Sequence, residues 1–267
     1  MEDTELTEKQ EECLEGALDL LDDGNPAAAL RELDGLPAAE PEVAGTAIEA
    51  WLELGEPGQA RSALEAGSWP PDDPDRLWLE GQVLLREWRI EEAERAFSEL
   101  HDRSPAPLTL NALALCRELV GDLTGADALH DAAAQLDPTG HPVPVRLDAA
   151  AFDQVVQEAV QELPPEFQAA IGDLRFLIEP MPDRALLRGG DPGAVPPDLL
   201  GLFSGPTLGE LGDGHAEAPV VHLFQRNIER VARDHDELRL EIRTTLYHEI
   251  GHFLGHDEEG VEAMGLG

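Results

Sequence analysis

Small and apolar residues recur at helical spacing through the first half of the chain. A glycine, or once a tryptophan, stands five residues before an alanine in each of four segments, and successive pairs are 31, 33 and 33 residues apart. This regular spacing predicts helical hairpins, because small residues let two antiparallel helices approach closely. The pairs are Gly24 and Ala29, Gly55 and Ala60, Trp88 and Ala93, and Gly121 and Ala126.

A proline follows the alanine by twelve residues in three of the four segments, where it ends one hairpin and starts the connection to the next. The pattern resembles the tetratricopeptide repeat family, whose units are ~34 residues long. The resemblance covers about residues 8–140 as four degenerate units, of which Leu77 to Pro105 is the best match. The alternative is a helical bundle without repeats.

Three prolines and a glycine interrupt the helical pattern between Asp137 and Pro144. Such a composition is typical of a linker between domains. We therefore predict a helical repeat domain over 1–140, a linker over 141–147 and a second domain over 148–267.

The second domain combines helical patterns with short apolar runs and loops rich in proline and glycine. An apolar stripe predicts a helix over 148–163. A last long helix begins at Asp234, where Glu237 is placed to complete a capping box, and it ends at Gly255. The other predicted elements are strands at 174–178, 199–203 and 220–224, a short helix at 228–233, and loops at 180–197 and 205–218.

The charge of the chain is strongly acidic. It has 18 basic and 56 acidic residues among 267, a formal net charge of −38. Phosphate backbones and anionic bilayers repel such a chain, which argues against nucleic-acid binding and a membrane-surface role. There is no apolar run of ~18 residues and no signal-peptide pattern, so we expect a cytoplasmic protein. Cys13 and Cys116 are too few for a disulfide framework or a cysteine zinc site.

The last helix carries the sequence His248-Glu249-Ile250-Gly251-His252. Histidines at i and i+4 are about 40° apart around a helix, so both imidazoles reach one ion. Zinc prefers such neutral nitrogen ligands, and a carboxylate beside them can take a proton from water at the metal. Glu249 is placed for that role. The alternative is a solvated helix end that happens to be rich in histidine and acidic residues.

A catalytic zinc needs a third protein ligand, and the residues after Gly255 offer several. In the extended metal-binding motif, the chain turns at this glycine and supplies a ligand three residues later, which is Glu258 here. Asp257 is the alternative and His256 the third choice. Glu259 can accept a hydrogen bond from the ring of a ligand. The competing interpretation is an exposed acidic run.

From about Val145 to the end, the chain is similar to a family of small zincin-like metallopeptidases. The resemblance implies a minimal zincin fold, in which a three-stranded sheet lies over the metal-bearing helix. It also implies His248 and His252 as zinc ligands, Glu249 as the base and an acidic third ligand. The residues that carry it are Phe152, Glu158 to Phe167, Leu200 to Gly205, and Ile242 to Glu258.

We therefore predict a mostly helical chain with a small α+β domain: tetratricopeptide-like hairpins followed by a minimal zincin fold. The predicted function is a zinc-dependent metallopeptidase whose repeats recognise a peptide or protein substrate, or a partner. The alternative is a protein-interaction scaffold with a structural or vestigial metal site. Tyr247 and His222 are lesser candidates for polarising a carbonyl, and Met264 for a Met-turn; packing is the alternative for each. The sequence does not indicate an oligomeric state.

Overall fold

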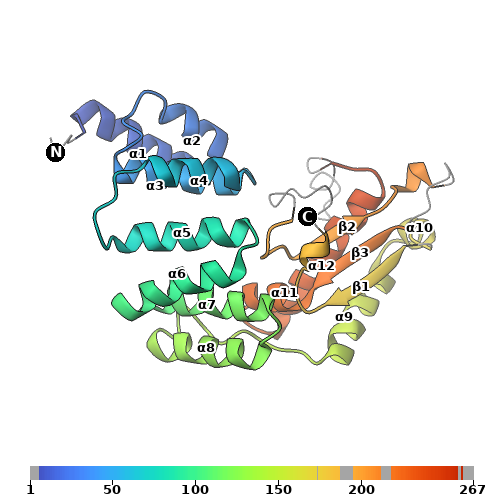
Figure 1. The fold of residues 1–267 in the computed structure, drawn as a ribbon. Coiled ribbons are helices and arrows are strands. Elements are labelled where there is room, and N and C mark those ends of the chain that lie inside the picture. Colours follow the sequence, from blue (N-terminus) through green and yellow to red (C-terminus); the bar gives the residue numbers. More distant parts are fainter. Residues whose placement is uncertain (1–5, 173, 187–194, 212–217, 258–259, 261–267) are drawn as a thin grey trace. The chain divides into compact units, whose positions relative to one another are not determined.

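The chain folds into a mostly helical structure with a small three-stranded sheet (Figure 1), which confirms the predicted fold class. It forms two compact units, the first of Met1–His141 with Asp183–Pro197 and the second of Pro142–Pro182 with Asp198–Gly267. The computed structural model describes residues 6–172, 174–186, 195–211, 218–257 and 260.

In the first unit, consecutive helices pack pairwise into four hairpins over the described residues (Figure 1). The predicted alanine of each segment lies on the second helix of a hairpin and is fully buried there. This arrangement is compatible with the predicted repeats. The helices are α1 (Glu8–Asp22), α2 (Pro26–Glu32), α3 (Pro41–Glu53), α4 (Pro57–Ala66), α5 (Pro74–Arg86), α6 (Ile90–Arg103), α7 (Pro107–Leu119) and α8 (Leu123–Leu136).

The turn inside each hairpin has a residue with positive φ at the predicted anchor position. Three anchors are glycines, which adopt this conformation without steric cost. Trp88 takes the same position at φ 56°, where a Cβ atom costs roughly 1–2 kcal/mol. Its indole N–H donates to the backbone carbonyl of Val195 over 2.8 Å, and both side chains are buried. The strained tryptophan thus holds the backbone at Val195, which belongs to the same unit.

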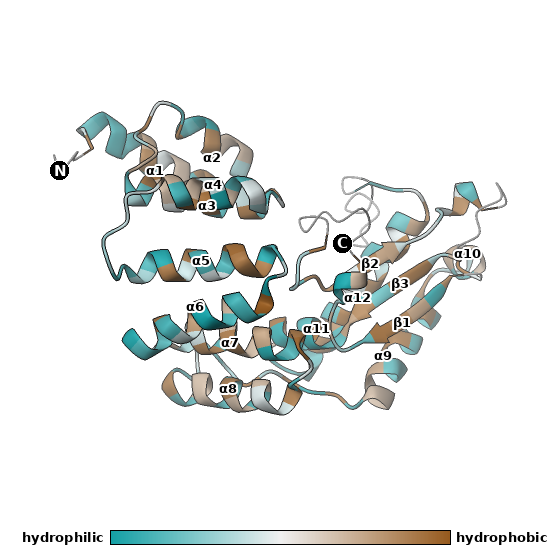
Figure 2. Ribbon diagram, viewed as in Figure 1, coloured by the Kyte–Doolittle hydropathy of each residue, from teal (hydrophilic) through white to brown (hydrophobic). Residues whose placement is uncertain are grey.

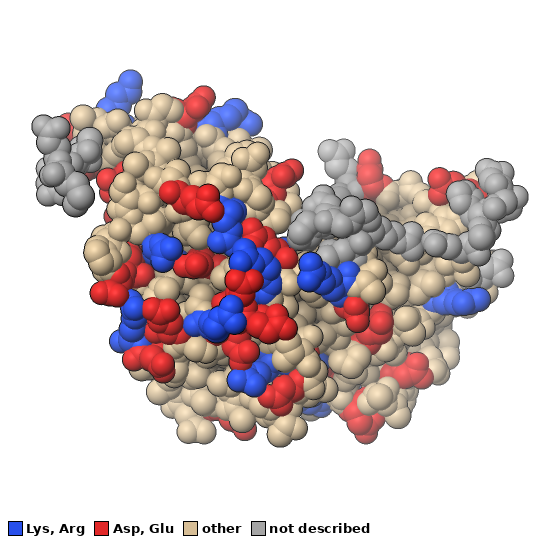
Figure 3. All heavy atoms as spheres, in the orientation of Figure 1, with Lys and Arg blue, Asp and Glu red and all other residues tan. Residues whose placement is uncertain are grey.

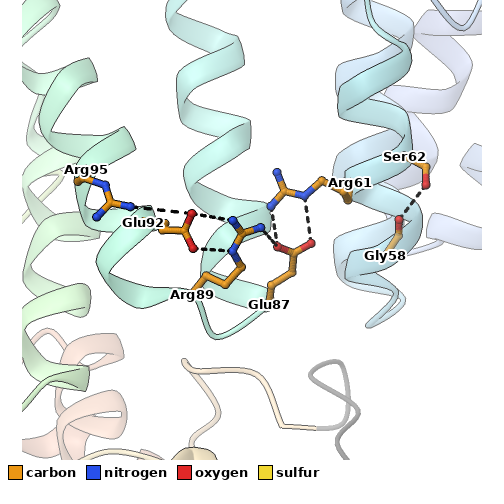
Figure 4. Close-up of polar contacts among 7 residues, drawn as sticks. All are labelled: Gly58, Arg61, Ser62, Glu87, Arg89, Glu92 and Arg95. Carbon is orange, nitrogen blue, oxygen red and sulfur yellow. Dashed lines mark hydrogen bonds and ion pairs between the residues drawn. The ribbon is translucent and has the colours of Figure 1, made fainter.

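Ion pairs brace the turn between α5 and α6 on both sides of this tryptophan (Figure 4). The Arg61 guanidinium on α4 pairs with Glu87, with Nη2 and Oε2 2.6 Å apart. Arg89 donates to Glu92 on α6 over 2.6 Å and also pairs with Glu87. The network therefore links α4, the turn and the start of α6.

Acidic and basic side chains lie interspersed over the face of the molecule drawn in Figure 3. Several arginines lie beside carboxylates because they form ion pairs with them, as Arg61, Arg89 and Arg117 do. Among the described helices, none is both long enough and apolar enough to span a membrane.

The second unit contains a mixed sheet with the strand order β1-β3-β2. β3 runs parallel to β1, where Phe176 pairs with Val221, and antiparallel to β2, where Gly201 pairs with Leu223. Hydrophobic residues concentrate along the strands (Figure 2). The three predicted strands are confirmed within two residues at each end. Their bounds are β1 (Arg175–Glu179), β2 (Gly201–Ser204) and β3 (Val220–Phe224).

Two amphipathic helices and the sheet enclose one apolar core. Val221 and Leu223 of β3 join the buried faces of both helices, including Phe152 and Ile242. The predicted helix over 148–163 is confirmed as α9, and that over 228–233 begins earlier, directly after β3. The bounds are α9 (Ala149–Glu162), α10 (Pro165–Ala170), α11 (Gln225–Val231) and α12 (His235–Phe253), with single 3-10 turns at Arg184–Leu186 and Leu208–Glu210.

A buried carboxylate fastens the start of the second unit to α11. Glu229 is only 1% exposed. It accepts hydrogen bonds from the Leu147 backbone N–H at 2.9 Å, from Arg146 at 3.0 Å and from Gln225 at 2.7 Å. These donors offset the cost of burying the charge. The chain entering α9 is therefore fixed relative to the helix that follows β3.

Candidate metal centre

The metal motif lies near the end of α12, whose predicted start and end are confirmed. The Asp234 carboxylate caps the helix by accepting from the backbone N–H groups of Asp236 and Glu237, both at 2.9 Å. The predicted capping box is wrong in one detail, because the Glu237 carboxylate accepts from the N–H of Arg233 at 2.7 Å. The chain turns out of the helix at Gly255, whose φ is +93°.

The two histidines of the motif face each other on one side of α12. Their Nε2 atoms are 3.0 Å apart, and their rings are nearly perpendicular, at 84°. Two nitrogens bound to one tetrahedral zinc would be ~3.3 Å apart, given bonds of ~2.0–2.1 Å. The pair formed by His248 and His252 is therefore close to the spacing of two ligands on one ion. Both side chains are partly exposed, so the pair is open to solvent.

The backbone after the helix orients one of these rings. Nδ1 of His252 lies 3.1 Å from the carbonyl oxygen of His256. A carbonyl only accepts, so Nδ1 carries the proton of this hydrogen bond and the neutral ring has its other nitrogen, Nε2, unprotonated. That is the tautomer in which imidazole binds a metal, and such a second contact is typical of ligating histidines. The His256 carbonyl thus orients the His252 ring, whose Nε2 faces His248.

Glu249 lies beside the histidines and is 7% exposed. The backbone N–H of Phe203 on β2 donates to its Oε2 over 2.6 Å. The approach of β2 is close because Gly201 has no side chain: a Cβ atom there would lie 2.7 Å from Thr245 Cγ2 and 2.9 Å from Glu249 Cγ. This contact was not predicted from the sequence, where the available indication was the glycine in the middle of the strand predicted over 199–203.

The candidates for a third ligand follow α12 in the chain. Glu258, the first candidate, lies outside the described residues, as do Glu259 and Met264. Asp257 is exposed, and its Oδ1 accepts from the N–H of Gly260 at 3.0 Å. Within the described part of the chain, no three His, Cys, Asp or Glu side chains are grouped to hold an ion. Thus the structure brings together His248 and His252, but not Asp257 with them.

Tyr247, a lesser candidate, has a contact that indicates packing. Its hydroxyl donates to the carbonyl oxygen of Ala159 at 2.8 Å, which ties α12 to α9. Burial raises the pKa of this hydroxyl.

His222, the other lesser candidate, is held within the sheet. Its ring lies 2.7 Å from the Glu179 carboxylate and 3.2 Å from the Ser204 hydroxyl. His222 pairs with Leu202 on β2. The residue before Leu202 is Gly201, and that position faces α12. Side chains alternate between the two faces of a strand, so His222 points away from the metal motif.

Comparison with known proteins bears on the C-terminal part of the chain. The zincin-like metallopeptidase family matches residues 171–267, which include the three strands and α12. The eight helices α1 to α8 and the helix α9 lie outside this match. No curated protein matches the chain.

Proposed function

We propose that the chain is a zinc-dependent metallopeptidase. The observation that carries this proposal is the pair of Nε2 atoms of His248 and His252, 3.0 Å apart, with the buried carboxylate of Glu249 on the next residue. The family match over 171–267 supports a metallopeptidase domain. In this proposal His248, His252 and Glu258 hold the ion, with Asp257 as the alternative third ligand.

The roles of the protein groups follow from their chemistry. A bound zinc ion would polarise the scissile carbonyl and lower the pKa of water. Glu249 takes the proton of the attacking water and passes it to the leaving amine, the usual work of a general base and acid. The Phe203 N–H orients this carboxylate, because a hydrogen bond of 2.6 Å fixes the position of Oε2.

The helical repeats supply recognition in this proposal. Stacked helical hairpins form an extended surface that suits a peptide or protein substrate, or a partner. The first unit has apolar cores of its own between its helices, so it can present such a surface as a formed structure.

Metal content tests the proposal directly. Mass spectrometry on untagged protein should find about one zinc per chain, and His252→Ala should lose it. Glu249→Gln should keep the zinc and lose turnover of a peptide library. Absence of zinc in the wild type after zinc is added back would overturn the proposed function, as would peptide turnover by Glu249→Gln.

A second candidate function is a protein-interaction scaffold with a structural or vestigial metal site. The separate cores of the first unit favour it, because the repeats need no catalysis to bind a partner. The two candidates differ in coordination: a catalytic ion keeps a position open to water, whereas four protein ligands close a structural site. X-ray absorption spectroscopy of the zinc-loaded protein distinguishes them.

A further inference from the structure

Two adjoining cavities of about 440 and 350 Å³ lie in the first unit. Their walls come mainly from α1, α3 and α5, the first helices of three successive hairpins. They share the residues Glu49, Trp78 and Leu79, so they are neighbours, and together they are called the acidic trough. Its combined volume is large enough for several side chains of a peptide.

The lining of the acidic trough is one-sided in charge. Of the described residues that line it, only Arg86 is basic. Apolar and aromatic residues also line the trough: Leu18 is 43% exposed, and Trp69 and Trp78 are part of the wall. The acidic residues of the lining are Asp22, Glu42, Glu49, Glu53, Asp73 and Asp75.

Gly45 keeps part of the trough open. It lies inside α3, where glycine costs about 1 kcal/mol relative to alanine. An added Cβ atom would meet Leu79 Cδ1 at 3.6 Å, an ordinary contact, so no steric reason in the described structure excludes alanine. The helix therefore gives up stability at a position where a larger side chain would fill the cavity.

We propose that the acidic trough binds a basic peptide segment of another protein, with a lysine or arginine cation between the Glu49 carboxylate and the Trp78 ring. Carboxylates and aromatic faces both attract such a cation. A second copy of this chain is a poor occupant, because it carries the same charge of −38 and only 18 basic residues. This inference rests on the recognition role of the repeats in the proposed function.

The Glu49 carboxyl lies close to other acidic groups. Partial desolvation, followed by the nearby Glu53 and Asp22 carboxylates, raises its pKa. A carboxyl whose pKa is raised by folding stabilises the protein below its unfolded pKa, and that contribution is lost as the pH rises through the folded pKa. The ionised form of Glu49 is thus the less favourable one in the folded chain, and a bound cation would stabilise it.

Glu49→Gln therefore changes stability and binding in opposite directions. The variant should raise the melting temperature at neutral pH, because it removes a repelled charge. It should also weaken the binding of a basic peptide about tenfold or more, because the cation of the peptide loses its carboxylate partner. A residue with only a structural role would not give this combination.

The experiment uses the full chain and two fluorescein-labelled peptides at about 0.15 M salt, where surface charges are screened beyond about 8 Å. One peptide alternates leucine and arginine, and the other has citrulline, which is neutral, for each arginine. We expect anisotropy to show binding of the arginine peptide and at least tenfold weaker binding of the citrulline peptide. Glu49→Gln and Gly45→Met should each weaken the binding of the arginine peptide. Glu65→Gln should not, because Glu65 is exposed on α4 and lies outside the trough.

Three results would overturn the proposal: equal affinity for both peptides, equal losses of affinity in Glu49→Gln and Glu65→Gln, or a dimer in sedimentation that Glu49→Gln dissociates.

The metal site is tested separately in the same assay. His252→Ala should bind the arginine peptide as the wild type does, so failure of the peptidase proposal and failure of the trough proposal give different results.

Discussion

The backbone N–H of Phe203 on β2 donates to the Glu249 carboxylate on α12 over 2.6 Å. A strand and a helix that are 46 residues apart in sequence thus fix the orientation of the proposed base. The contact depends on Gly201, where a side chain would overlap Thr245 and Glu249 on α12.

Gly201→Ala should lower turnover and leave the zinc bound. The added Cβ would overlap Thr245 and Glu249, so the carboxylate must move, and a misplacement of about 1 Å costs roughly 100-fold in rate. Kinetic assays with zinc analysis on the same sample measure both effects. Gly209→Ala is the matched control, because nothing lies within 4 Å of its added Cβ. Unchanged turnover in Gly201→Ala would contradict this role for the close approach.

Glu258→Gln should weaken zinc binding far more than Asp257→Asn does. The proposed third ligand is Glu258, whereas Asp257 already accepts from the backbone N–H of Gly260. Competition with a chromogenic chelator gives the two zinc affinities. The reverse order would assign the ligand to Asp257.

Glu229→Gln should lower the free energy of unfolding by about 1.5–3 kcal/mol, because a neutral amide replaces the buried carboxylate that accepts from Arg146, Leu147 and Gln225. Glu162→Gln is the comparison, since its ion pair with Arg243 is about half exposed. That variant should cost at most about 1 kcal/mol. Urea denaturation measures both, and similar losses would show that burial does not set the value of the Glu229 contact.

Trp88→Phe should release the segment at Val195 while the helices persist. Phenylalanine keeps an aromatic ring but has no N–H, so a buried carbonyl loses its donor at roughly 1–3 kcal/mol. Limited trypsin digestion should cut faster after Arg184, with an unchanged helical circular dichroism spectrum. An unaltered cleavage rate would argue against Trp88 as the anchor of this segment.

Cys116 should resist alkylation in the folded protein. Burial, and then the carboxylate of Glu94, raise the pKa of its thiol to about 12, so almost no thiolate is present at neutral pH. Cys13 is partly exposed and should react with iodoacetamide. Mass spectrometry of native and guanidinium-treated samples checks this, and native labelling of Cys116 would contradict the buried position of the thiol.

Local patterns were sufficient to predict most of the elements. The period of Gly24, Gly55 and Gly121 located the turns of the hairpins, because a turn with positive φ favours glycine wherever it occurs. The spacing of His248 and His252 was enough to predict that they share a face, since helix geometry alone determines it.

Contacts between distant segments were not predictable in this way. Nothing near Phe203 in sequence indicates that its N–H meets Glu249, because that contact depends on how β2 packs against α12. Likewise, no neighbouring residue in the sequence explains why Trp88 stands where the other three hairpins have glycine. Its hydrogen-bond partner, Val195, is 107 residues away.

The bond between Trp88 and Val195 also sets an order of events during synthesis. The helices around Trp88 leave the ribosome long before Val195 is made, and at ~5–20 residues per second the interval is roughly 5–20 s. During that time the indole N–H of Trp88 lacks its acceptor, the carbonyl of Val195. The nascent first unit is thus incomplete until translation has passed β1, and no single cut in the chain yields both units whole.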